Sequence, residues 1–199
     1  MEGMDANHGD KAHHVDVDVQ SGTETLVWEK HGAIHISTKA MSIAWASDNR
    51  FWESMDLPND DFKEKYEYKI FATAVELKQV SCLEVVGSVD LAKLAELSLS
   101  LSHEKTYEIV YHIKFKVDAF GWQNLPVTFA LFTPDEQTRR SEVLESRRGH
   151  SNQWHEVHGN DFKGPKTTTG KLSFGMFETS NQKWKGGMIL AGVTIRAKN

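Results

Sequence analysis

The chain has 199 residues, of which 39% are hydrophobic and 10% aromatic, enough for one substantial core with or without a tail. Its formal net charge of -5 comes from the start of the chain. Of 28 acids and 23 bases, residues 1–24 hold six acids and the single base Lys11, which leaves 22 of each in the remainder. A domain without net charge lacks the field that draws proteins onto phosphate backbones or anionic lipid, so this balance argues against both partners.

Cys82 is the single cysteine, which excludes an internal disulfide framework. The N-terminus lacks the basic patch and apolar run of a secretory signal, and no stretch approaches the roughly 20 apolar residues that cross a bilayer. We therefore expect a reducing, cytosolic compartment and no membrane partner. Because Cys82 lies in the apolar stretch QVSCLEVVG, we expect an inert, buried thiol.

Residues 1–24 combine charged and small side chains with almost no large apolar ones, so they cannot offset the entropy of ordering. We predict a flexible acidic tail there, followed by one domain over residues 25–199. The tail carries histidines and acids that could chelate a metal, but they lack the fixed spacing of a zinc site, so we expect no metal and no cofactor. These residues are His8, His13, His14, Asp16 and Asp18.

From Leu26 onward, apolar residues recur with period two, which is typical of strands that bury one face. Short strands are predicted over 26–28, 33–37, 42–45, 70–75, 79–86, 140–145 and 153–157. The stretch KTYEIVYHIKFKVD (105–118) predicts a long strand. Its odd positions from Tyr107 to Val117 are expected to face the core, whereas Glu108, His112, Lys114 and Lys116 are expected to face solvent.

Three further strands are predicted over 126–133, 171–178 and 187–198. In the last of them, Ile189, Ala191, Val193 and Ile195 should share one apolar face. Only residues 90–102 favour a helix. Many short strands joined by polar, glycine-bearing loops indicate an all-β fold, an antiparallel β-sandwich or jelly roll with at most one short helix, whose ligands usually meet the loops at one end.

Four loops combine tryptophan with polar side chains: WASDNRFW, DAFGWQNLP, GHSNQWHEVHGND and SNQKWKGG. A pyranose ring has an apolar C–H face and a rim of hydroxyls, so a sugar site pairs an exposed aromatic ring with convergent polar groups. The strongest ligand candidate is Trp184, which lies between Lys183 and Lys185 in the hairpin loop that joins the last two strands.

The other tryptophans are assigned from their neighbours. Trp45 ends an alternating run and should point inward, as a packing residue. Trp52 follows a polar loop and Trp122 follows a glycine, so either could form a second wall of the site. The groups expected to bond sugar hydroxyl and acetamide groups are Asn181, Lys183, Lys185, Arg50 and Asn124, and the sequence leaves open whether Lys183 or Lys185 faces the ligand.

Two other functions have weaker support. A glycosidase needs two carboxyl groups roughly 5 to 10 Å apart, and the available pairs are Asp135 with Glu136, Glu142 with Glu145, and Glu156 with Asp161, none of them in a diagnostic motif. RNA binding would depend on the arginines of TRRSEVLESRRGH, where interleaved acids favour a self-paired segment. These arginines are Arg139, Arg140, Arg147 and Arg148.

Four blocks in order resemble the phloem protein 2 family, the plant phloem lectin domain shared with the tobacco leaf lectin. They are KAMSIAWASDNRFW, VSCLEVVGSVDLAKLAELSLSLSHEKTYEIVYHIKFK, HEVHGNDF and KWKGGMILAGVTIR. The resemblance covers about residues 26–199. With its long amino-terminal tail, the chain is similar to the cucurbit phloem lectins.

The resemblance implies a β-sandwich lectin without catalysis, in the cytoplasm or phloem sap. It would bind N-acetylglucosamine oligomers and the chitobiose core of N-glycoproteins, usually as a homodimer, and RNA binding is associated with cucurbit members. It also implies sugar-binding roles for the early tryptophans, here Trp45 and Trp52, and for Trp184–Lys185 by similarity to glycoprotein-specific F-box proteins. Phe51 stands where the family leads us to expect tyrosine. An uninterrupted lysine run of the kind that supports nuclear import is missing, which leaves nuclear entry in doubt.

Overall fold

The structure, a computed structural model, describes residues 20–199 except 22–23, 26, 67–68 and 97. Most of the predicted tail, including its histidines, lies outside the described residues. The part nearest the domain contributes two short strands, β1 (Gln20–Ser21) and β2 (Glu24–Thr25), which pair with each other. Within the described residues, no helix is long and apolar enough to cross a membrane.

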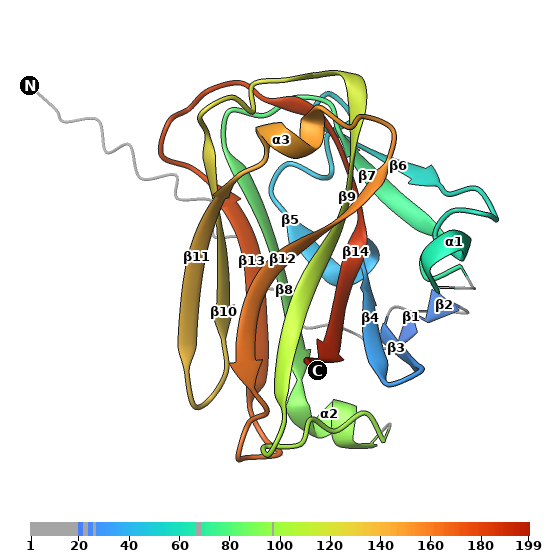
Figure 1. Ribbon diagram of the computed structural model, residues 1–199, viewed down its shortest axis with the longest axis vertical. Helices are drawn as coiled ribbons and strands as arrows, with labels where there is room; N and C mark the ends of the chain where they lie inside the picture. Colours follow the sequence, from blue (N-terminus) through green and yellow to red (C-terminus); the bar gives the residue numbers. More distant parts are fainter. Residues whose placement is uncertain (1–19, 22–23, 26, 67–68, 97) are drawn as a thin grey trace, which may run out of the picture.

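The domain is an all-β sandwich of two antiparallel sheets, as the sequence predicts (Figure 1). A five-stranded sheet has the order β11-β10-β13-β8-β5, and a seven-stranded sheet contains the path β12-β9-β14-β4-β3, with β6 and β7 joined to it through β14. The strands of the first sheet are β5 (Met41–Ile43), β8 (Leu83–Asp90), β10 (Pro126–Phe132), β11 (Gln137–Val143) and β13 (Lys171–Glu178). Those of the second are β3 (Val27–Lys30), β4 (Ala33–Ser37), β6 (Trp52–Asp56), β7 (Thr73–Leu77), β9 (Thr106–Phe120), β12 (Trp154–Lys163) and β14 (Gly186–Ala197).

Helical segments are short and more numerous than the single one expected at most. They are α1 (Lys63–Tyr66), α2 (Leu91–Glu96), α3 (Glu145–Arg148) and a 3₁₀ turn over Thr38–Ala40. Only α2 lies where the sequence favoured a helix. The turns α1 and α3 escape hydrophobic periodicity because a helix of four residues is too short to repeat it.

The main core fills the space between the sheets, and β14 is buried on both faces. The predicted single apolar face of this strand is wrong, because its register against β9 shifts between Leu190 and Gly192. An extra residue in a strand exchanges the two faces beyond it. Ile189 and Ala191 therefore belong to a second, smaller apolar cluster, whereas Val193 and Ile195 face the main core.

The second cluster lies where the chain segment carrying α1 packs on the seven-stranded sheet. Phe62 and Phe71 are buried in it, and both rings contact His112 of β9. Burial of His112 contradicts its expected exposure, because that expectation assumed an uncovered outer sheet face. Conversely, Val117 is exposed rather than buried, since β9 pairs irregularly with β14 between Gly186 and Met188.

Candidate functional site

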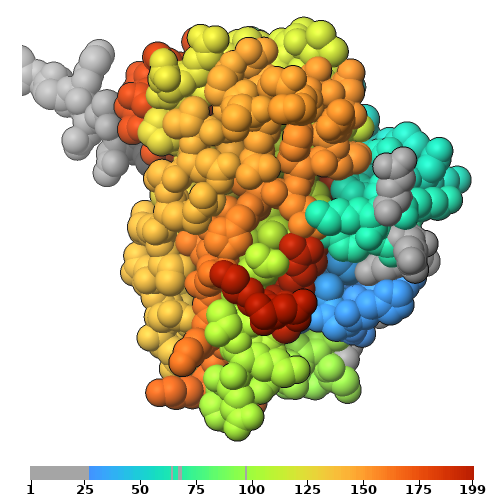
Figure 2. All heavy atoms as spheres, viewed as in Figure 1, coloured from blue at the N-terminus to red at the C-terminus, as the bar shows by residue number. Residues whose placement is uncertain are grey.

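The loops that follow β5, β7, β9 and β13 meet at one end of the sandwich, at the top of Figure 1. Hydrogen bonds tie them together: Lys78 N–H donates to the Phe51 carbonyl over 2.8 Å, and Val80 and Lys185 exchange two backbone bonds of 2.9 Å. In the space-filling view, the red atoms of the β13–β14 loop adjoin the yellow-green atoms of the β9–β10 loop at this end (Figure 2). The loops after β5, β9 and β13, which carry Trp45, Trp122 and Trp184, therefore lie at the same end of the sandwich.

Trp184 is displayed at this end, with 54% of its surface exposed. Its backbone lies against the β9–β10 loop so closely that a Cβ on Gly121 would be 2.1 Å from the Trp184 carbonyl oxygen. Gly121 also has a φ of +81°, which L side chains rarely adopt. Glycine at this position therefore permits the contact that supports the Trp184 loop.

Lys185, expected to bond the ligand, is fully buried. Its ammonium group lies 2.8 Å from the Glu178 carboxylate and donates to the Ser81 carbonyl over 2.8 Å. A lysine can occupy a core only with such partners, because an unpaired buried charge is costly. The assignment of Lys185 as a ligand group is wrong, and Lys183, which is exposed, is the lysine that faces the solvent side of the loop.

Asn181 is exposed, as expected, and its backbone N–H donates to Glu178 Oε1 over 3.2 Å. The Ser180 hydroxyl donates to the same oxygen. Burial raises the pKa of Glu178, but bonds from Lys185, Asn181 and Ser180 outweigh that effect and lower it below the ordinary value. Glu178 therefore remains ionised at neutral pH and anchors both ends of the loop that carries Trp184.

The two tryptophans of the early loop have the opposite burial from that expected: Trp45 is exposed, and Trp52 is buried. Trp45 is 57% exposed and has a φ of +69°, because the chain leaves strand geometry after Ile43 and the alternation ends there. Its ring lies 5.6 Å from that of Phe51. Trp52 is buried, since it begins β6 with its side chain inward, and its indole N–H donates to the Ala44 carbonyl over 3.0 Å.

Arg50 is exposed and hydrogen-bonded to Asp48 through Nε and Nη2, with its guanidinium 5.4 Å from the Phe51 ring. This arrangement places one aromatic pair and one paired arginine at the surface of the early loop. The β7–β8 loop connects this early loop with the loop that carries Trp184, because its backbone forms hydrogen bonds to both Phe51 and Lys185.

Trp122 is not a wall of the site. It is fully buried, its indole N–H donates to the Gly186 carbonyl over 2.9 Å, and its ring contacts Phe115 at 5.2 Å. It supports the start of β14 from beneath, so its role is to hold the loop end together. Asn124, two residues on, is exposed in a left-handed conformation with a φ of +51°.

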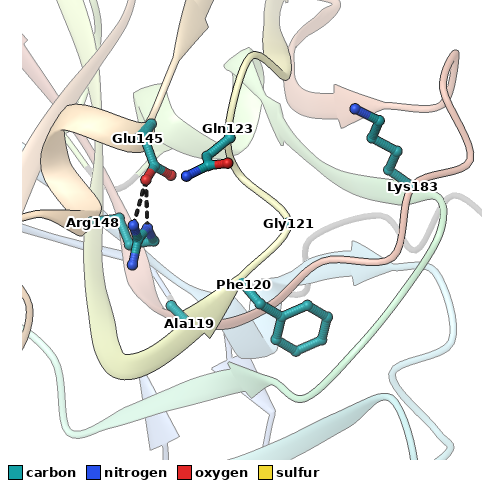
Figure 3. Close-up of a pocket in the computed structure, with 7 residues that line it drawn as sticks. All are labelled: Ala119, Phe120, Gly121, Gln123, Glu145, Arg148 and Lys183. Atoms are coloured by element: carbon teal, nitrogen blue, oxygen red, sulfur yellow. Dashed lines mark hydrogen bonds and ion pairs between the residues drawn. The ribbon is translucent and has the colours of Figure 1, made fainter.

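A hollow of about 360 Å³ opens beside the Trp184 loop. Figure 3 shows Glu145 and Arg148 of α3 on one side and Lys183 across the opening, with the Gln123 side chain between them. The remaining lining residues are Ala119, Phe120 and Gly121, from the end of β9 and the following turn. The hollow thus combines an apolar wall, which includes the 44% exposed Phe120, with several hydrogen-bond donors.

As parts of a sugar site, sequence reasoning missed four of these residues: Phe120, Gln123, Glu145 and Arg148. It considered Glu145 only for glycoside hydrolysis and Arg148 only for RNA binding. A signal for α3 was present, because Glu145 and Arg148 have the i, i+3 spacing of a helical ion pair and Gly149 follows. The predicted strand over 140–145 hid it. No local sequence pattern indicates that α3 lies next to the β9–β10 turn, because the two segments are about 20 residues apart in the chain and meet only in the tertiary structure.

A larger hollow of about 740 Å³ lies between α1 and the start of β12. Its tryptophan, Trp154, has the Phe62 ring on one side, at 4.7 Å, and the Lys114 ammonium 4.6 Å from its centroid. The indole N–H donates to Asp61 over 3.1 Å. Because these partners occupy the ring, Trp154 does not offer the free face that Trp184 and Trp45 offer.

The acids considered for glycoside hydrolysis are engaged with cations or backbone. Burial raises the pKa of Glu156, but hydrogen bonds from Arg196, Tyr66 and Lys65 outweigh it and lower the pKa to about 2. The pKa of Asp161 is likewise lowered by Lys198 and His158 against the effect of burial. Asp135 and Glu136 accept backbone N–H bonds from Lys166 and Lys163. A general acid needs a raised pKa, so Glu156 and Asp161 are unsuited to that role.

Three of the four arginines considered for RNA are paired within the chain: Arg140 and Arg147 with Glu142, and Arg148 with Glu145. This agrees with the self-paired segment expected from the sequence. Cys82 is partly exposed rather than buried, because β8 begins one residue after it.

One trio, Glu108, His158 and Asp161, has ligand atoms within 4.8 Å of one another. Arg196 already pairs with Glu108 over 2.7 Å, and Lys198 pairs with Asp161. These cations neutralise the carboxylates, so the trio is better described as an ion-pair network than as a metal centre.

Comparison with known proteins matches residues 31–197 to the family described as phloem protein 2. Two relatives from Arabidopsis thaliana are named protein PHLOEM PROTEIN 2-LIKE A5 and A1. The chain is 31% identical to the first over 174 residues, which cover 87% of this chain and 39% of the relative, and 30% identical to the second over 161 residues, which cover 80% and 59%. It therefore spans about two fifths to three fifths of the length of these relatives. Among solved structures, a Podospora anserina GH26-CBM35 β-(1,4)-mannanase is similar with a TM-score of 0.44 and 6% identity, over 85% of this chain and 28% of that one.

Proposed function

This chain belongs to the phloem protein 2 family, and from that membership and the loop end described above we propose that it is a non-enzymatic lectin for N-acetylglucosamine oligomers and the chitobiose core of N-glycans. The family supports a phloem protein of this type. The finer assignment depends on one observation, the exposed ring of Trp184 on a loop whose Lys183 lines a hollow with several hydrogen-bond donors.

The chemistry of the loop end suits a sugar. Trp184 offers an apolar face for the C–H face of a pyranose, and Lys183, Gln123 and Arg148 supply donors for hydroxyl and acetamide oxygens. Trp45, over half exposed at the same end, supplies a second aromatic surface. The proposed site therefore comprises Trp184, Lys183, Asn181, Asn124 and Arg50 from the predicted set, together with Trp45, Gln123 and Arg148.

A shallow site with few contacts should bind a disaccharide only at about micromolar to millimolar strength, roughly 4 to 8 kcal/mol. Two sites in one homodimer would raise the avidity for a glycoprotein that carries several glycans. We propose the cytoplasm and phloem sap as the location, with N-glycosylated proteins as partners.

The test is a glycan array probed with the wild type and Trp184→Ala, followed by titration calorimetry with chitotriose. We expect chitotriose to be bound by the wild type and at least about tenfold more weakly by the variant, since stacking and buried apolar area are lost together. Trp154→Phe is the matched control, because that ring is occupied by internal partners. Undiminished binding by folded Trp184→Ala would exclude the site, and a wild type silent on every glycan would exclude the lectin.

A further inference from the structure

The hollow beside Trp184 has two chemically different walls. Ala119, Gly121 and the partly exposed ring of Phe120 form an apolar wall, and Gln123, Arg148 and Lys183 contribute N–H groups. Lys183, the residue before Trp184, lines the hollow, and Gly121 in its apolar wall lies against the Trp184 backbone. The hollow therefore adjoins the loop that carries the Trp184 ring.

The charges in the hollow largely cancel. Arg148 donates from both Nε, at 2.8 Å, and Nη2, at 2.5 Å, to the same Glu145 oxygen. The bond from Arg148 lowers the pKa of Glu145, so its carboxylate is ionised at neutral pH. Lys183 contributes the remaining positive charge, and it forms no ion pair with the residues that the structure describes. The lining therefore offers donors without the strong positive field that an anionic ligand would require.

We propose that this hollow is the acetamido subsite of the glycan site: the methyl group of an N-acetyl substituent packs on Phe120 and Ala119, and its carbonyl oxygen accepts hydrogen bonds from Arg148 and Lys183. The inference rests on the proposed lectin function and adds the residues that select the substituent. A hydroxyl in place of the acetamido group would leave Phe120 uncovered and one donor of Arg148 or Lys183 unpaired, which is how a polar site rejects an analogue.

Glu145 has a separate role in this subsite, as a positioning residue. Its Oε1 accepts hydrogen bonds from both Nε and Nη2 of Arg148 and so holds the guanidinium in one orientation. Its negative charge repels carboxylate and sulfate groups. Replacing it with glutamine keeps the shape but leaves Arg148 as an unpaired cation, which favours anionic sugars.

The experiment compares chitotriose with cellotriose, which carries hydroxyls in place of the acetamido groups, by titration calorimetry on the full chain. We expect the wild type to prefer chitotriose by about tenfold or more. Arg148→Met and Phe120→Ala should lower that ratio several-fold, because each variant loses more affinity for chitotriose than for cellotriose. Arg139→Met, an exposed arginine on β11 outside the hollow, is the matched control and should leave the ratio intact.

A second measurement uses 6-O-sulfated chitotriose, for which Glu145→Gln should bind several-fold more tightly than the wild type, with thermal unfolding checked in parallel. The subsite is overturned if folded Arg148→Met and Phe120→Ala keep the wild-type ratio, or if Glu145→Gln does not gain affinity for the sulfated sugar. Those results leave the lectin function standing whenever Trp184→Ala still weakens chitotriose binding. A wild type that binds no chitotriose instead overturns the proposed function and the subsite with it.

Discussion

Lys185 and Glu178 form an ion pair of 2.8 Å whose side chains are both inaccessible to solvent, although Lys185 directly follows the exposed Trp184 in the chain. Glu178 ends β13 and Lys185 precedes β14, so the pair closes the base of the intervening loop. The same glutamate accepts bonds from Ser180 and Asn181 within that loop. This clamp orders the backbone on both sides of Trp184 before any ligand arrives, which lowers the entropic cost of binding.

Breaking the clamp on one side should be strongly destabilising. Lys185→Met leaves the Glu178 charge buried and unpaired, so we expect a loss of about 3 to 5 kcal/mol in the free energy of unfolding. Urea denaturation would measure it. Lys183→Met, at an exposed lysine two residues earlier, is the control and should change stability by less than about 0.5 kcal/mol. Equal effects of the two substitutions would contradict a buried pair.

Replacing both partners should separate stability from binding. Because well-packed neutral side chains often substitute for a buried ion pair at no cost, we expect Glu178→Gln with Lys185→Met to be more stable than Lys185→Met alone. The loop would lose the bonds that Glu178 makes, however, so chitotriose binding should remain weaker than in the wild type. Calorimetry and urea denaturation on the same samples test this, and a double variant with wild-type affinity would show that the clamp does not position Trp184.

The early loop offers a contrast between two tryptophans. Trp52→Ala removes a buried indole and should cost about 3 to 5 kcal/mol of stability. Trp45→Ala removes an exposed ring, so its effect on stability should stay within about 1 kcal/mol while chitotriose binding weakens. Thermal unfolding and calorimetry distinguish the two effects. The assignment of Trp45 fails if its removal destabilises the fold as much as that of Trp52.

Gly121 supports Trp184 by close contact, and Gly32 provides a matched control. Both have positive φ, +81° and +80°, but a Cβ on Gly32 would meet nothing within 4 Å. Gly32→Ala should therefore show only the cost of the backbone conformation, about 1 to 2 kcal/mol. Gly121→Ala adds a clash with the Trp184 carbonyl, so we expect a larger loss of stability and weaker chitotriose binding. Indistinguishable unfolding free energies would argue against the contact.

Stability should also fall in mild acid because two histidines are buried and uncharged. Burial lowers the pKa of His35 to about 4 and that of His112 to about 3, and both bond the Thr194 hydroxyl, at 2.8 and 2.7 Å. A histidine whose pKa is lower when folded contributes full stability above its ordinary value near 6.5. That stability is lost as the pH falls, because the unfolded chain binds the proton first.

We expect a loss of about 1.4 kcal/mol per pH unit for each of these histidines between pH 6.5 and 4.5. Glutamates such as Glu156, whose ordinary pKa is 4.5, bind protons in the unfolded chain below about pH 5.5 and add to the loss there, so the slope due to the histidines is read between pH 6.5 and 5.5. Urea denaturation at several pH values measures the slope. His112→Gln should reduce the slope by about half, whereas a slope unchanged in that variant would contradict the assignment.

Much of the fold could be predicted from local pattern. Period-two alternation located β4, β9, β10, β13 and β14 within about two residues, because each strand exposes one face to a core and the other to something different. It failed where the partner strand, not the strand itself, decides the geometry. The pairing of β9 with β14 decides both the bulge between Leu190 and Gly192 and the exposure of Val117. The residues of either strand taken alone do not indicate this pairing.

For the site, the sequence by itself determined that Trp184 lies on a polar hairpin loop between two alternating strands, where a large ring has no strand face to fill. It could not determine which polar neighbours reach the surface. Lys183 and Lys185 have similar neighbours in the sequence, yet Lys185 is buried because its ammonium group binds Glu178 and Ser81. Trp122 and Trp52 are buried as well, and each indole N–H donates to a backbone carbonyl in the interior. Tertiary structure decided these assignments because burial of a polar or amphipathic side chain depends on partners that lie far away in the chain.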